Sequence, residues 1–338
     1  MNSLNGSTSD NNPSLLLGNP RLMSLLRCPV CGGPLARQGE VLTCDADAER
    51  RTEAHRFPVA FGCPVLIDES RSVYAIEDFT GRRDTFFALD LPWWRRLGRA
   101  LIPKIGVNIH AARNIRGFAR RLNREGGTPL VLVIGGSVLG EGMHILAADA
   151  TVQLIESDVS FGPRTQLIAD SHVLPFADDS LDGIVVQAVL EHVLDPLQCV
   201  REIRRVLRPG GLVYAEIPFM QPVHGGRYDF TRYTDLGLRR LFRHFNHIDS
   251  GATCGTGMAL AWSAQYFLAS FARGTAARRV LSAIAAYLTF YLKYFDRWLI
   301  DRAGTLDGAS GLFFLGAKSG SEIPLDDRIL LASYRGAL

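Results

Sequence analysis

The segment that decides the fold reads Val131-Leu-Val-Ile-Gly-Gly-Ser-Val-Leu-Gly140. Four apolar residues run directly into a glycine-rich turn, a pattern typical of a buried parallel strand that delivers its end to a ligand. Glycine lets the backbone approach a bound nucleoside closely, and the helix expected over residues 141–148 offers free N–H groups at its start. The segment therefore predicts an α/β sheet with a ligand at the carboxyl end of this strand.

Acidic residues follow the next two strands that the sequence predicts. Glu156 comes after the strand expected at residues 151–155 and lies 21 residues beyond Gly135. A Rossmann-like fold places an acid that holds ribose hydroxyls at about this distance, and Asp158 is the alternative. Asp170 follows a third short strand, and the sequence Leu-Pro-Phe176 closes the loop before a strand that begins at Asp182.

The order of these motifs resembles that of class I S-adenosylmethionine-dependent methyltransferases. The resemblance covers about residues 128–250 and includes Leu190-Glu-His-Val193 and Arg205-Val-Leu-Arg-Pro-Gly-Gly211. It implies an α/β fold with a Rossmann-like seven-stranded sheet over residues 128–320, in which strands six and seven lie at 247–251 and 311–317 and a helical insert occupies 253–308. The resemblance also implies that S-adenosylmethionine is bound by Gly135, Gly136, Gly140, Glu156, Asp158, Asp170, Ser171 and Gln187.

The glycine loop departs from the family's pattern in two respects. The family usually has an acid two residues before the first glycine, where this chain has Val133, and the glycine turn is longer here by about one residue. The departure concerns recognition of the methionine amine. A non-catalytic partner protein with the methyltransferase fold is therefore one alternative function.

Two places at the carboxyl edge of the predicted sheet offer acid–base side chains. His192 follows the fourth strand beside Glu191, and His224 and Tyr228 lie in a glycine-containing loop after the fifth strand. Methyl transfer depends mainly on the alignment of the reactants, and a general base is needed chiefly for a hydroxyl acceptor. His192, His224 and Tyr228 are the candidate catalytic residues, and Arg232 is a candidate for an anionic group unless it pairs with Asp229.

Residues 21–70 contain Phe57-Pro58 and then Gly62-Cys63-Pro64-Val65-Leu66, a pattern similar to that of a small zinc-ribbon-like module related to the methyltransferase activator proteins. Cys28-Pro-Val-Cys31 followed by two glycines is a typical metal knuckle, and Cys44 lies 13 residues beyond Cys31. His55 is the preferred fourth ligand and Asp47 a weaker substitute, whereas Cys63 lies in an apolar run and is expected in the core. The expected zinc ligands are Cys28, Cys31, Cys44 and His55.

The remaining segments are predicted from periodicity and composition. Residues 1–20 and 321–338 are expected to be tails, and 71–127 a helical linker with Asn108 as a helix cap. Residues 278–300 carry an apolar stripe opposite Asp296 that predicts packing in a helical bundle, a lid over the acceptor, a dimer face or a membrane-surface helix. Residues 80–124 contain eleven Lys and Arg against Asp84 and Asp90, a net charge of about +9. This basic segment could face RNA, an anionic membrane surface or a phosphorylated substrate, or be a solvated helical face.

Composition limits the location and the size of the protein. The chain has 338 residues, of which 47% are hydrophobic and 21% charged, enough for one large domain and one small one. Its longest nearly apolar run is about 13 residues, short of the roughly 20 that span a bilayer. We expect a cytoplasmic methyltransferase, at most peripheral to a membrane, that acts on a small-molecule or glycan-type acceptor. An RNA methyltransferase of the ribosomal RNA type is the nearest alternative.

Overall fold

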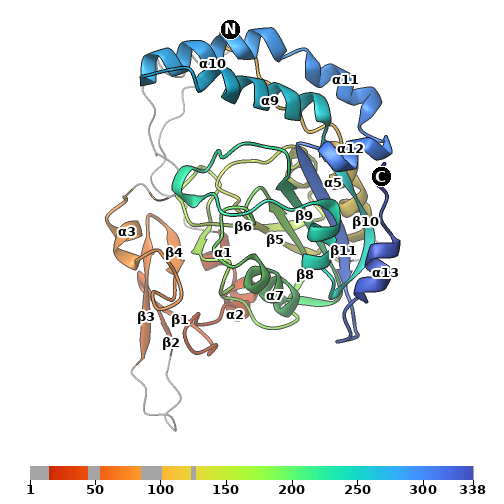
Figure 1. Cartoon of the computed structure of the whole chain (residues 1–338). Coiled ribbons are helices and arrows are strands. Elements are labelled where there is room, and N and C mark those ends of the chain that lie inside the picture. The colour runs from red at the N-terminus through yellow and green to blue at the C-terminus, as the bar shows by residue number, and fades with distance from the viewer. Residues whose placement is uncertain (1–14, 45–53, 84, 86–100, 123–126, 338) are drawn as a thin grey trace.

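The protein is described from a computed structural model covering residues 15–44, 54–83, 85, 101–122 and 127–337 (Figure 1). Eleven strands form one sheet in the order β1-β2-β3-β4-β7-β6-β5-β8-β9-β11-β10. Seven of them make the α/β core that the sequence predicts, and β11 is the antiparallel member because it runs against both β9 and β10. The core strands are β5 (Leu130–Ile134), β6 (Gln153–Asp158), β7 (Leu167–Ala169), β8 (Leu181–Gln187), β9 (Leu207–Pro218), β10 (Phe245–Cys254) and β11 (Gly311–Lys318).

Strand β5 lies at the centre and is buried on both faces. Its alternating side chains enter two different hydrophobic clusters. Val131 and Val133 pack with α5 (Ala111–Leu122) and with residues beside α6 (His144–Ala147) on one face. Leu130, Leu132 and Ile134 pack with α7 (Pro196–Val206) and α8 (Asp235–Leu241) on the other. A strand between two helical layers is apolar at every position, which explains the continuous run in the sequence.

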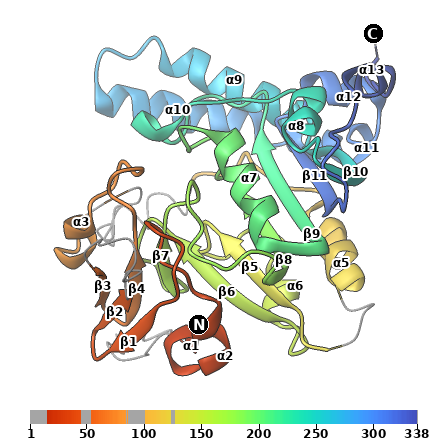
Figure 2. The same cartoon turned by 90° about the horizontal axis from the view of Figure 1, so that it is seen from below.

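The N-terminal module extends the core sheet at one edge (Figure 2). It consists of the antiparallel strands β1 (Ala36–Gln38), β2 (Val41–Cys44), β3 (His55–Ala60) and β4 (Cys63–Leu66). Strand β4 pairs in parallel with β7, so that Val65 lies opposite Ile168. The short helices α1 (Leu15–Gly18) and α2 (Pro20–Leu25) precede the module, and α3 (Ile76–Thr80) follows it. The module is therefore joined to the core by backbone hydrogen bonds and is not a separately tethered unit.

Four helices lie between β10 and β11, in the region predicted to hold an insert. They are α9 (Thr256–Ala269), α10 (Thr275–Thr289), α11 (Leu292–Leu299) and α12 (Ala303–Gly308). Figure 1 shows α9, α10 and α11 together at one end of the molecule. The predicted apolar stripe does not form the packed face. Ala285 and Ala286 are buried, whereas Ile284, Leu288 and Tyr291 are at least 45% exposed, because the small residues allow close approach to α9.

Asp296 also differs from the prediction. It was placed opposite the apolar stripe, on the solvated face, but it lies inside the helical layer. Its side chain is fully buried, and its two oxygens accept the backbone N–H groups of Gly257 (2.7 Å) and Met258 (2.9 Å) at the start of α9. A carboxylate on one helix thus satisfies the free donors at the beginning of another.

We expect Asp296→Ala to lower the free energy of unfolding by about 1–3 kcal/mol, because two buried N–H groups lose their acceptor. Urea denaturation followed by circular dichroism measures this change. Asp301→Ala is the matched control, since Asp301 is 74% exposed in its side chain and should shift the midpoint little. An unchanged midpoint for Asp296→Ala would contradict the capping role.

Other predicted boundaries also differ from the structure. Residues 15–20 were expected in the tail, but Leu16 and Leu17 are buried against the core. The C-terminal tail contains α13 (Asp327–Ala332), whose N-terminus is capped by Asp326. Helix α6 is one turn, shorter than the predicted 141–148, because turns at both glycines 140 and 142 delay its start. In the described part of the chain, no helix is both long and apolar enough to cross a bilayer.

Candidate functional site

A cavity of about 460 Å³ opens at the carboxyl ends of β5, β6, β7 and β8. This is the edge at which open α/β sheets bind ligands. The cavity contains eight of the residues that the sequence analysis assigned to cofactor binding or catalysis. They are Gly135, Gly140, Asp158, Asp170, Ser171, Gln187, His192 and Tyr228. Gly136, Glu156 and His224 are not among the residues that line it.

The glycine loop closes one wall of the cavity. Gly135 has a φ of 76°, and a Cβ at this position would lie 2.4 Å from Val189 Cγ2. A Cβ on Gly140 would lie 2.4 Å from Gln187 Oε1. Larger residues therefore cannot replace these glycines without moving their neighbours. Gly136 faces away, because a Cβ there would meet Glu156 Cβ at 3.0 Å.

The two acids near the end of β6 have different partners. Glu156 is 3% exposed and pairs with Arg164, whose Nε donates to its Oε1 at 2.6 Å. Asp158 ends the strand, lines the cavity and accepts the backbone N–H of Ser137 at 3.0 Å. Burial raises the pKa of both carboxyl groups and outweighs these hydrogen bonds, which lower it. Of the two acids, Asp158, which the sequence analysis gave as the alternative to Glu156, is the one that lines the cavity.

Two hydrogen-bond partners hold Asp170 at the cavity. One is near it in sequence, and the other lies in the segment that follows β4. His172 Nδ1 lies 2.6 Å from Asp170 Oδ1, and the Ser72 hydroxyl donates to Oδ2 at 2.6 Å. Burial opposes ionisation, but the His172 and Ser72 hydrogen bonds outweigh it and lower the pKa of Asp170. The Ser171 hydroxyl lies 3.3 Å from Cys199 Sγ inside the core, so Ser171 meets the cavity with its other atoms.

Several lining residues were missed by sequence reasoning. Glu216 lies near the end of β9, where it accepts a hydrogen bond from the Tyr214 hydroxyl and one from Asn108 Nδ2 at 2.8 Å. Asn108 was predicted to cap a helix, but α5 begins at Ala111 and Asn108 instead binds Glu216. The rule that acids at the carboxyl ends of strands face ligands could have found Glu216. No local signal marks Tyr74, which reaches the cavity from the segment after the module.

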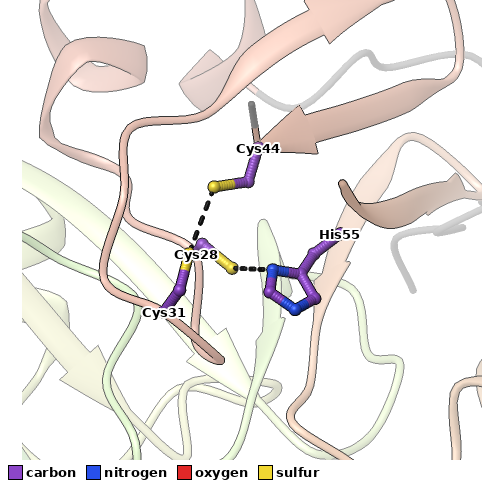
Figure 3. Close-up of side chains that lie close together, drawn as sticks. All are labelled: Cys28, Cys31, Cys44 and His55. Atoms are coloured by element: carbon purple, nitrogen blue, oxygen red, sulfur yellow. Dashed lines mark hydrogen bonds between the residues drawn. The ribbon is translucent and has the colours of Figure 1, made fainter. Parts of the chain in front are cut away.

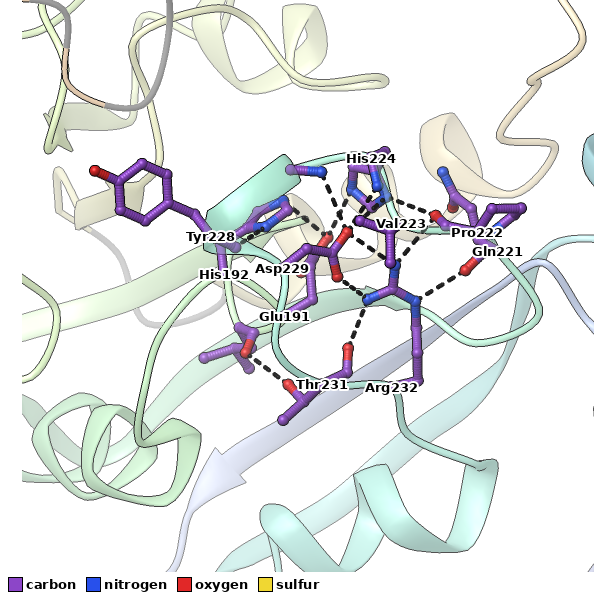
Figure 4. Close-up of polar contacts among 12 residues, drawn as sticks. Glu191, His192, Gln221, Pro222, Val223, His224, Tyr228, Asp229, Thr231 and Arg232 are labelled. Atoms are coloured by element: carbon purple, nitrogen blue, oxygen red, sulfur yellow. Dashed lines mark hydrogen bonds and ion pairs between the residues drawn. The ribbon is translucent and has the colours of Figure 1, made fainter. Parts of the chain in front are cut away.

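The candidate catalytic residues are held in a network after β8 and β9 (Figure 4). His192 and Tyr228 line the cavity, and His192 Nδ1 lies 2.7 Å from the backbone oxygen of Tyr228. His224 lies behind His192, with 5.0 Å between the ring centroids. The Glu191 carboxylate raises the pKa of His224, and this effect outweighs burial of the ring, which lowers the pKa.

Arg232 was a candidate for an anionic ligand, but its guanidinium forms an ion pair with Asp229. Two further hydrogen bonds join Arg232 to the backbone oxygens of Gln221 (3.0 Å) and Pro222 (3.2 Å). The pair that the sequence left as the alternative is therefore the one observed. Its position makes Arg232 part of the framework that holds the loop 221–232.

A second cluster lies in the N-terminal module (Figure 3). The four expected metal ligands come together, with all of their ligand atoms within 4.8 Å of one another. Cys28 Sγ lies 3.5 Å from His55 Nδ1, and Cys31 Sγ lies 3.3 Å from Cys44 Sγ. Residue Asp47, the weaker substitute, lies outside the described residues. Cys63 lies apart from the cluster and contacts the backbone oxygen of Thr165 at 3.1 Å.

The thiols of this cluster differ in acidity. Burial opposes ionisation of Cys31, but a backbone hydrogen bond at Gly33 and contacts with Cys44, Cys28 and His55 lower its pKa to about 7. Burial and the neighbouring Cys31 raise the pKa of Cys44 to about 12. Three crowded sulfurs beside an imidazole are the donor set of Cys₃His zinc sites.

The basic segment is described only in part, since residues 84, 86–100 and 123–126 lie outside the described residues. Within the described part, Arg83 pairs with Asp78 at 3.3 Å and Arg113 approaches Asp301 at 3.9 Å. Arg120 and Arg121 donate to carbonyl oxygens of their own helix. These contacts fit a solvated helical face. Binding of RNA or of a membrane surface by this segment stays a prediction.

Comparison with known proteins identifies relatives of the core. Residues 137–215 match the family described as "Methyltransferase domain". The ubiquinone/menaquinone biosynthesis C-methyltransferase of Hahella chejuensis is 29% identical over 133 residues, which are 37% of this chain and 53% of that protein. The ubiquinone biosynthesis O-methyltransferase of Xanthomonas oryzae pv. oryzae is 30% identical over 146 residues, or 39% and 58% of the two chains. The chain spans about half the length or less of the first curated relatives it matches.

Among solved structures, the chain is similar to a chain in the complex between the Haloferax volcanii Trm112 methyltransferase activator and the putative methyltransferase. The alignment has a TM-score of 0.38 and 19% sequence identity, and it covers 62% of this chain and 90% of the other.

Proposed function

Because the chain carries a class I S-adenosylmethionine-dependent methyltransferase domain, we propose that it transfers a methyl group to a small-molecule or glycan-type acceptor. The observation that carries this proposal is the set of carboxyl side chains that line the cavity at the carboxyl edge of the sheet. Its lining includes four carboxylates, Glu141, Asp158, Asp170 and Glu216, in a space of about 460 Å³. Such a lining suits a cofactor that carries a positive sulfonium and an ammonium group.

The residues present fit S-adenosylmethionine. Gly135 and Gly140 line the cavity, and without side chains they let a ligand approach the backbone closely. Asp158 would accept the ribose hydroxyls, and Asp170 would accept the adenine amine. Glu216 is a candidate for the methionine ammonium, because Val133 stands where the family usually has an acid. When bound, the cofactor supplies an electrophilic methyl group.

The acceptor we infer is largely apolar. Four cavity-lining residues expose apolar side chains by 46% to 59%, namely Val73, Val138, Leu194 and Phe230. Burying such surface stabilises a complex by roughly 25 cal/mol per Å². Two relatives are named for ubiquinone biosynthesis, which is consistent with an apolar acceptor. His192 and Tyr228 lie on the same cavity and are the candidate residues on the acceptor side.

Isothermal titration calorimetry with S-adenosylhomocysteine tests cofactor binding directly. We expect one site per chain, with a dissociation constant between about 1 µM and 1 mM, the usual range for enzyme substrates. Added S-adenosylmethionine should compete for the same site. No measurable binding of either compound would refute the proposal and favour a non-catalytic partner protein.

We infer that the N-terminal cluster of Cys28, Cys31, Cys44 and His55 holds a structural zinc ion. Its donors are the thiolate and imidazole ligands that tetrahedral zinc prefers, and four protein ligands leave no open position. Gly33 supports this inference, since a Cβ there would lie 3.0 Å from Cys44 Sγ and would crowd the cluster. The ion would join the end of β2, at Cys44, to the start of β3, at His55, beside the strand that extends the core sheet.

A further inference from the structure

Glu191 is a charged residue placed where its charge has no hydrogen-bond partner. The side chain is 0% exposed, and in the part of the chain that the structure describes neither carboxylate oxygen accepts a hydrogen bond. Removing an ionised carboxylate from water is strongly unfavourable unless another charge compensates it. A cation close to both oxygens would therefore stabilise the Glu191 carboxylate in this position.

Two imidazole nitrogens face this carboxylate. His192 Nε2 and His224 Nε2 each lie 3.6 Å from Glu191 Oε1, just beyond hydrogen-bond distance. Ligands bound to one ion at about 2.1 Å, with angles between 90° and 110°, lie roughly 3.0–3.5 Å from one another. The observed spacing is close to that of ligands sharing an ion.

The other ring nitrogens indicate how the two imidazoles are protonated. His192 Nδ1 lies 2.7 Å from the Tyr228 carbonyl oxygen, and His224 Nδ1 lies 3.3 Å from that of Pro222. A carbonyl oxygen only accepts, so each Nδ1 carries the hydrogen, and in the neutral ring the lone pair lies on Nε2. Donation of the second ring N–H to a backbone carbonyl is the usual support for a metal-binding histidine.

The loop that carries His224 is fixed independently of any ligand (Figure 4). Asp229 accepts the backbone N–H groups of His224 (2.8 Å) and Gly225 (3.2 Å), and it pairs with Arg232. The N–H of Phe230 donates to the backbone oxygen of Glu191 at 2.8 Å. The three side chains are thus preorganised across two strand ends that lie about 30 residues apart in sequence.

We propose that Glu191, His192 and His224 bind a divalent first-row transition ion such as Zn²⁺ or Fe²⁺. The three ligand atoms lie within 4.8 Å of one another, and two imidazoles with one carboxylate suit such ions. Three protein ligands leave coordination positions open, as in metal sites that bind a substrate. The ion would place a positive charge beside the buried carboxylate.

The site adjoins the cavity, because His192 lines it. Resting on the proposed function, the inference is that the acceptor carries an oxygen, such as a hydroxyl or a carbonyl, that completes the coordination. An ion in this position would orient the oxygen and lower the pKa of a hydroxyl. The acceptor is then an oxygen-bearing molecule with an apolar body.

Cobalt binding to the full chain tests the ion site without any need for activity. After treatment with a chelator, we expect two Co²⁺ per chain. One of them gives thiolate-to-metal absorption from the cysteine cluster, and the other gives only weaker ligand-field bands. Glu191→Gln and His224→Gln should each lose the second ion and keep the thiolate absorption. His144→Gln is the matched control, since His144 is exposed on α6 and should keep both ions.

Each outcome decides the inference. A wild-type protein that binds cobalt only with thiolate absorption would overturn it, as would full retention of the second ion in both variants. Binding of S-adenosylhomocysteine by the same samples reports their folding. If that compound fails to bind wild type while the second cobalt ion binds, then the proposed function fails and the ion site stands. If it binds and the second ion is absent, the ion site alone fails.

Discussion

Asp158→Asn is expected to weaken the binding of S-adenosylhomocysteine by about 10- to 150-fold, equivalent to the 1.5–3 kcal/mol of hydrogen bonds to a charged group. Asp158 lines the cavity at the end of β6, where a carboxylate can accept two ribose hydroxyls. Asparagine keeps an oxygen for the Ser137 N–H, which Asp158 accepts at 3.0 Å, so the glycine loop should retain its shape. Titration calorimetry at constant pH measures the change.

Glu156→Gln is the matched control for this result. Glu156 is the acid at the spacing that the sequence favoured, but it pairs with Arg164 and does not line the cavity. We expect its replacement to change affinity by less than about threefold and to lower stability modestly, because Arg164 loses a charged partner. A large loss of affinity in Glu156→Gln with a small one in Asp158→Asn would reverse the assignment of the ribose-binding acid.

Cys28→Ser is expected to remove one equivalent of zinc and to lower the midpoint of thermal unfolding by more than about 5 °C. The stability change follows from the topology, since β4 of the module pairs directly with β7 of the core. Loss of the ion would free the strands that support this edge of the sheet. Metal analysis of purified protein and differential scanning calorimetry measure the two effects.

Cys63→Ser provides the comparison within the same module. Cys63 is buried like the ligands Cys28 and Cys44, yet its sulfur contacts the Thr165 backbone oxygen and no residue of the cluster. Its replacement should leave the zinc content unchanged, so that it separates loss of a ligand from loss of a buried thiol. Equal zinc contents in wild type and Cys28→Ser would rule out the zinc assignment.

The sequence was sufficient for those features that depend on local pattern. The apolar run at 131–134 predicts a strand buried on both faces, and the structure confirms it as central β5. The sixth and seventh strands also lie where the family resemblance placed them. Cys28 and Cys31 share one turn, so their proximity needs no tertiary information, and the hairpin strand β2 returns Cys44 to them.

Local pattern was insufficient wherever the packing of two separate segments decides which side chains are buried. Periodicity marks the stripe in residues 278–300 as apolar, but small residues decided which face packs, and Ala285 and Ala286 are the buried ones. Spacing favoured Glu156 over Asp158, whereas the direction of each side chain depends on Arg164 and on the glycine loop. Neither arrangement can be derived from one segment alone.

The sequence by itself thus determined where the core strands lie along the chain, the glycine loop and the cysteine-rich module, because these follow from hydrophobic period, turn chemistry and short ligand spacing. Only the tertiary structure decided which acids face the cavity, and only it brought His224 beside Glu191 and His192. The physical reason is that burial and the meeting of distant side chains depend on how separate elements pack, and a linear pattern does not encode that packing locally.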